Sequence, residues 1–200
     1  MPDTTETRDQ KRERQVKEQF EALGRFVQAF EALVFSIRSR VRMLAPTPYN
    51  PVLIAIIVNH KALTAQAIWE ILRAVMGELS RQSAIGDLDD SAFSSIIREI
   101  DTEFQALVKD RNSLLHGTWL IGYHAEDDTD YSKFKILNLN PSKSGLGSRA
   151  DLPTTAEELD ELSTRCKALS SKIEGLSFVL AGVVPFLARF EKVGARWVFK

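Results

Sequence analysis

Apolar side chains recur at alternating intervals of three and four residues over three segments, 20–44, 93–108 and 159–183. This spacing places them on one face of an α-helix that packs against neighbours. A fourth segment, 51–81, is apolar on every side in its first two turns, which is typical of a buried helix. The pattern predicts an all-α fold, a four-helix up-and-down bundle.

The pattern changes between the third and fourth of these helices. Aromatic and β-branched residues at 119–123 and 134–139 predict a small β insertion within 119–140. The glycine-containing stretch 141–153 is expected to be a loop, and 196–200 a short terminal strand. We assign 1–14 to a polar tail and 15–200 to a single domain.

Composition narrows the function classes. The chain carries 26 basic and 27 acidic residues, a net charge of −1, so any nucleic-acid contact must come from a local basic patch. A single cysteine, Cys166, excludes a disulfide framework and a cysteine metal cage. The longest apolar run, 52–58, is too short for a bilayer span, and no signal peptide is visible. We expect a cytoplasmic protein with no membrane partner, no metal and no cofactor.

Arg111 interrupts the apolar face of the third helix. At 100° per residue, five apolar side chains lie within about 40° of it. They are Phe93, Ile100, Phe104, Leu107 and Leu115. A guanidinium at this position requires a carboxylate, a polar cavity or an anionic ligand, because leaving it unpaired costs several kcal/mol. Asn112, His116 and Trp119 lie along the flank of the same face.

The segment KDRNSLLHGTW, residues 109–119, resembles the signature of the HEPN superfamily, helical domains with an R-x4-6-H motif late in a core helix. Arg111 and His116 match that motif with four residues between them. Asn112 matches the polar residue that follows the arginine. The four-helix prediction agrees with the family fold, and the resemblance extends over about 16–190.

The resemblance implies a metal-independent endoribonuclease with a composite site in a homodimer, acting in toxin–antitoxin systems or antiphage defence. RNA supplies its own nucleophile, the 2′-hydroxyl, so the protein needs a proton shuttle and a stabiliser of phosphorane charge. His116 suits the first task near neutral pH, and Arg111 suits the second. Asn112 orients the imidazole or binds the substrate. An antitoxin or a nucleotidyltransferase is a further partner that the resemblance implies.

Trp119, Arg38 and Arg42 are candidate substrate-binding residues, the first by stacking on a base and the arginines by contacting phosphates. Each has a structural alternative: Trp119 packs in the core or a dimer interface, and the arginines form a solvated helix face. His60 and His124 lack a ligand constellation and are expected to be structural or exposed.

Two further alternatives stay open. In the first, the chain is a purely structural scaffold in which Arg111 pairs with an acidic residue on another helix, such as Glu31 or Glu70. Otherwise the chain is a non-catalytic HEPN-type module that binds RNA, a nucleotide or a protein, which the near-neutral charge fits at least as well.

Overall fold

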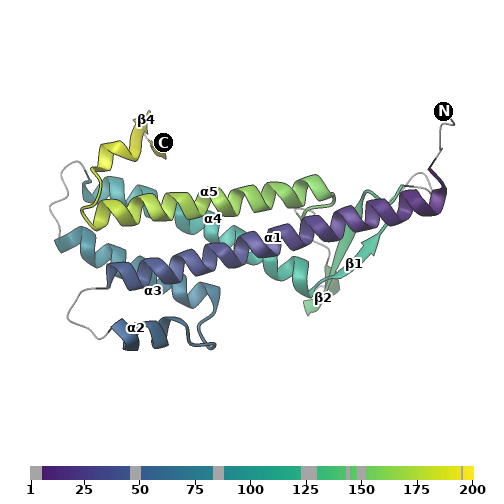
Figure 1. The fold of residues 1–200 in the computed structure, drawn as a ribbon, viewed down its shortest axis with the longest axis horizontal. Helices are drawn as coiled ribbons and strands as arrows, with labels where there is room; N and C mark the ends of the chain where they lie inside the picture. Colours follow the sequence, from purple (N-terminus) through teal and green to yellow (C-terminus); the bar gives the residue numbers. More distant parts are fainter. Residues whose placement is uncertain are drawn as a thin grey trace. The chain divides into compact units, whose positions relative to one another are not determined.

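In a computed structural model, the structure describes residues 6–45, 51–82, 88–122, 130–142, 145–147, 152–194 and 196–200. These residues form helices α1 (Arg8–Leu44), α2 (Pro51–Val58), α3 (Ala65–Gln82), α4 (Asp90–His116) and α5 (Ala156–Leu180). The strands are β1 (Thr118–Ile121), β2 (Phe134–Ser142), β3 (Gly145–Gly147), β4 (Phe190–Val193) and β5 (Arg196–Phe199), and a 3₁₀ turn covers Phe186–Ala188. The predicted all-α class with a small β insertion before the last long helix is confirmed (Figure 1).

Three boundaries differ from the prediction. The helix expected at 51–81 is two helices, because the polar residues after Val58 end α2 and the Thr64 hydroxyl caps α3 by accepting from the Ala67 amide at 3.2 Å. α1 begins at Arg8, inside the expected tail, where Thr7 and Gln10 form a reciprocal cap of 2.9 and 3.3 Å. The loop expected at 141–153 contains β3, which pairs with β2.

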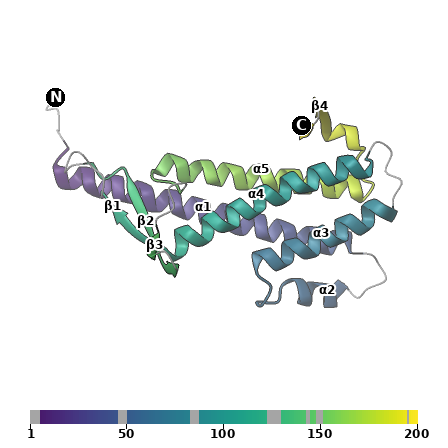
Figure 2. The same cartoon turned by 180° about the vertical axis from the view of Figure 1, so that it is seen from behind.

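The chain divides into two compact units. The first unit comprises Met1–Phe30 and Lys109–Arg165, and the second comprises Glu31–Val108 and Cys166–Lys200. Both Figure 1 and Figure 2 show the first unit's strands beside the N-terminal part of α1. In the second unit, α2 lies along α3.

In the first unit, the β insertion is fastened to α1. β1 and β2 pair antiparallel, with Trp119 opposite Ile136. Gln15 accepts from the Tyr131 amide at 2.9 Å, and the Gln19 amide donates to the Tyr131 carbonyl. Two polar side chains on one helix face therefore position the chain entering β2.

The second unit is built around Trp69, which is fully buried. Its indole N–H donates to Asp101 Oδ1 at 2.7 Å, and its ring lies 5.4 Å from that of Phe104. The expected terminal strand is present as β5, which pairs with β4. The ring of Phe199 on β5 lies over Gly175 of α5, where only a residue without a Cβ permits such an approach.

Among the described residues, no helix is long and apolar enough to cross a membrane.

Candidate functional site

The motif 111–116 occupies the last turns of α4. The Asp89 carboxylate caps the start of α4 by accepting from the Ala92 amide at 2.6 Å. The helix ends at His116, after which the Gly117 amide still bonds to the Ser113 carbonyl at 3.0 Å. The motif is thus held on regular helix, directly before β1.

The buried face of α4 lies beside Arg111 rather than centred on it. Its buried apolar positions are Ala92, Ile96, Ile100, Phe104, Leu107 and Leu114. Phe93, expected on this face, is half-buried and Leu115 is exposed. The residue that continues the buried line between Leu107 and Leu114 is Asp110, which is 8% exposed. The expectation that Arg111 occupies the centre of the apolar stripe is therefore corrected.

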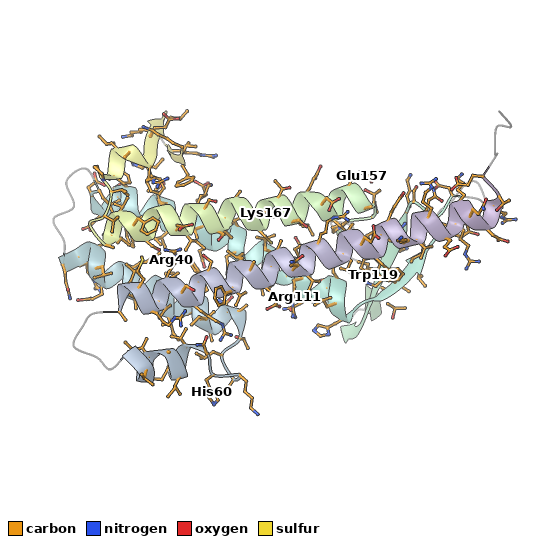
Figure 3. All side chains as sticks on the ribbon, in the orientation of Figure 1. Arg40, His60, Arg111, Trp119, Glu157 and Lys167 are labelled. Carbon is orange, nitrogen blue, oxygen red and sulfur yellow. The ribbon has the colours of Figure 1, made fainter. Side chains whose placement is uncertain are left out.

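Arg111 is half-buried at the edge of that face. Its Cζ lies 5.9 Å from the ring centroid of Phe30, a cation–π contact, and its Nη1 donates to Asn112 Oδ1 at 3.3 Å. The guanidinium therefore lies beside an aromatic ring and is only partly accessible, and Figure 3 shows its place on the helix.

Asn112 and His116 are both exposed. They are four residues apart on the helix, so their side chains share one face and lie one turn from each other. The side-chain oxygen of Asn112 also accepts the hydrogen bond from Arg111, so the guanidinium lies next to that face. The helix thus places a guanidinium, an amide and an imidazole within two turns, with the amide and the imidazole exposed and the guanidinium half-buried.

Sequence reasoning missed Asp110. Its Oδ2 lies 3.9 Å from Nη1 of Arg165 on α5, an ion pair within the first unit. The two side chains line a shallow cleft of about 310 Å³ together with Leu152, Pro153, Glu158, Glu161 and Leu162. The signal was available, since Asp110 is three residues from Leu107 and four from Leu114, the spacing of the buried face.

Trp119 is half-buried where the β insertion packs against α1. Its ring stacks on Phe134 with centroids 4.3 Å apart and lies near-parallel to Phe20 at 6.3 Å. Its indole N–H donates to the Leu114 carbonyl at 2.8 Å. These contacts favour the packing alternative over base stacking.

The candidate phosphate-binding arginines belong to the second unit. Arg38 donates to the carbonyls of Val58 at 2.7 Å and Leu63 at 3.2 Å, so it fastens the end of α2. Arg42 is exposed. Arg38 thus has a structural task that sequence reasoning did not anticipate, because backbone carbonyls leave no trace in a residue pattern.

The remaining candidates have local roles. Glu70 accepts from Gln66 and Arg73 of its own helix, at 3.0 and 2.6 Å. His60 Nδ1 accepts from the Ala62 amide at 3.2 Å, which agrees with the structural expectation, and His124 lies outside the described residues. Within the described ranges, no three histidine, cysteine or acidic residues are grouped so that they could hold a metal ion.

Comparisons with protein-family models, with curated proteins and with solved structures found no match for the chain.

Proposed function

We propose that the protein is a HEPN-like endoribonuclease that needs no metal ion, with Arg111, Asn112 and His116 as its catalytic group. The observation that carries the proposal is the arrangement of three side chains at the end of α4. The half-buried guanidinium of Arg111 donates to Asn112, and Asn112 shares an exposed helix face with His116. The sequence resemblance and the predominantly helical fold support the same proposal.

The proposed reaction is a transesterification. His116 removes the proton from the ribose 2′-hydroxyl, whose oxygen attacks the adjacent phosphorus. Arg111 binds the non-bridging phosphate oxygens as negative charge accumulates on them. The P–O5′ bond breaks, and a second imidazole protonates the leaving oxygen, giving a 2′,3′-cyclic phosphate and a 5′-hydroxyl.

The reaction requires an acid and a base in one turnover, and the chain supplies one imidazole in the motif. A homodimer with two-fold symmetry would bring His116 and Arg111 of both copies to one site. The homodimer is therefore part of the proposal, together with RNA as the substrate.

The decisive experiment compares the full chain with Arg111→Ala and His116→Ala on mixed cellular RNA in the presence of a chelator. We expect His116→Ala to lose roughly 10²–10⁴-fold and Arg111→Ala about 10²–10³-fold in cleavage rate. His60→Ala and Arg81→Ala are matched controls, because both side chains are exposed and lie outside the motif. Undiminished cleavage by His116→Ala would remove His116 from the mechanism.

A non-catalytic binding module is the second candidate. The near-neutral charge favours it, as does the use of Arg38 for holding α2 rather than phosphate. RNA binding without cleavage, weakened by Arg111→Ala, would establish this function in place of catalysis.

A further inference from the structure

The second unit exposes an apolar helix. Val52, Ile56 and Ile57 of α2 are 63%, 61% and 51% exposed, although they are aliphatic. Val52 and Ile56 lie one turn apart on the same face. α2 contains no charged residue, and both ribbon views show it on the outer side of α3. Exposed apolar groups that adjoin one another mark an interaction surface.

α2 is held to the rest of the second unit at its C-terminal end. Val58, at the end of α2, is buried, and Arg38 of α1 donates two hydrogen bonds to the carbonyls of Val58 and Leu63. One end of α2 is therefore fixed to the unit by a charged donor. Val52, Ile56 and Ile57 precede that anchored end and stay more than half exposed.

The surrounding sequence carries charge of one sign. No aspartate or glutamate occurs between Glu31 and Glu70, although the whole chain has a net charge of −1. This acid-free span contains four cations, Arg38, Arg40, Arg42 and Lys61. Arg40 is paired with Glu174 at 2.9 Å, whereas Arg42 before α2 and Lys61 after it are exposed. Figure 3 shows His60, the neighbour of Lys61, in the turn that follows α2.

We propose that α2 docks the second unit onto the surface of an anionic lipid bilayer. Val52, Ile56 and Ile57 enter the boundary between headgroups and acyl chains, and Arg42 and Lys61 contact lipid phosphates. Exposed aliphatic side chains with a cation before and after them in the sequence fit this surface. RNA would match the cations and leave the apolar residues in water, and a second copy would bring like charges together.

This contact goes beyond the proposed ribonuclease activity and is independent of it. It departs from the expectation of no membrane partner, which was based on the length of the apolar run, because a contact at the bilayer surface needs no spanning segment. Its affinity is expected to be modest, near the 10⁴ M⁻¹ or so of a single myristoyl chain.

The test is co-sedimentation of the full chain with vesicles of phosphatidylcholine alone or with about a third phosphatidylserine. We expect binding to the anionic vesicles, weakened roughly tenfold or more by Ile56→Asp. Arg42→Gln and Lys61→Gln should each weaken it about fivefold, the equivalent of about 1 kcal/mol per cation. Leu187→Asp is the matched control, since Leu187 is a 48% exposed aliphatic residue of the same unit outside α2. Equal unfolding temperatures would show that the variants keep their fold.

Three results would overturn the proposal. The first is no sedimentation with anionic vesicles, and the second is equal binding by Ile56→Asp and the unmodified chain. The third is self-association in solution that Ile56→Asp abolishes without any vesicle binding, which would assign α2 to a second copy. The RNA cleavage rate of Ile56→Asp is measured without vesicles. We expect it to be unchanged, so a failure of the membrane proposal can be told apart from a failure of the ribonuclease proposal.

Discussion

Replacing Trp119 separates a packing role from a substrate-binding role. The alanine variant loses the stack on Phe134 at 4.3 Å, the contact with Phe20 and the hydrogen bond to the Leu114 carbonyl. Truncating a tryptophan in a core costs about 3–5 kcal/mol, and because Trp119 is half-buried we expect the lower end, about 3 kcal/mol. The phenylalanine variant keeps the stack and loses the hydrogen bond, which costs about 1 kcal/mol.

The assay is thermal unfolding of the full chain, in parallel with RNA affinity at a temperature where both variants are folded. At about 2–4 °C per kcal/mol, Trp119→Ala should unfold some 6–12 °C lower, and Trp119→Phe only a few degrees lower. RNA affinity should stay unchanged in both, as in Trp197→Ala, a control in the second unit. A base stacked on Trp119 would be worth about 1–3 kcal/mol of binding. Lost RNA affinity with unchanged stability would therefore refute the packing assignment.

Three further predictions concern stability. Gly175→Ala should destabilise the fold by about 1–2 kcal/mol, because its Cβ would lie 2.2 Å from a phenylalanine ring of β5. Gly77→Ala, where a Cβ would meet open space, should stabilise the fold by about 1 kcal/mol, and thermal unfolding measures both changes. Hydrogen bonds from Ser132 lower the pKa of Asp130. Its charged form therefore stabilises the fold above about pH 4, and this stabilisation is lost as pH falls through the folded pKa. Asp130→Asn should remove that acid sensitivity when unfolding is measured from pH 5 to 2. Arg38→Ala should increase amide hydrogen exchange in 51–58 at least tenfold, because the end of α2 loses the bond to Val58 and the turn after it loses the bond to Leu63.

The long helices were predictable from the sequence because each buries one face, and the repeat of three and four reports that face directly. The break between α2 and α3 was not, since a segment that is apolar on every side has no phase to interrupt. The signals there were the polar residues that follow Val58 and the capping Thr64. β4 was missed because its four residues are too few for an alternating pattern, and Gly194, at φ 62°, was the sign of the turn to β5.

In two helices the buried face lies one residue away from the face that the sequence predicts. In α1 the expected line through Phe20, Leu23 and Val27 is replaced by the buried line through Gln19, Ala22 and Phe26, with Phe20 left 53% exposed. In α4 the buried line passes through Asp110 instead of Arg111. Neighbouring positions differ by 100° on a helix, so a wide apolar arc includes both, and only the partner surface decides which one is covered.

The displacement changes what Arg111 is suited to do. An arginine at the centre of a packed face would be sealed from any substrate and would need a carboxylate beside it. At the edge, the guanidinium is half-buried, lies beside the Phe30 ring and donates to Asn112, so the cation is held in place without being fully enclosed. Binding a phosphate requires this combination, since a fixed donor loses little freedom when an anion arrives and an accessible one can receive it. The buried line of α4 is continued by Asp110, which is paired with Arg165, so the packing of this face does not require Arg111 at its centre.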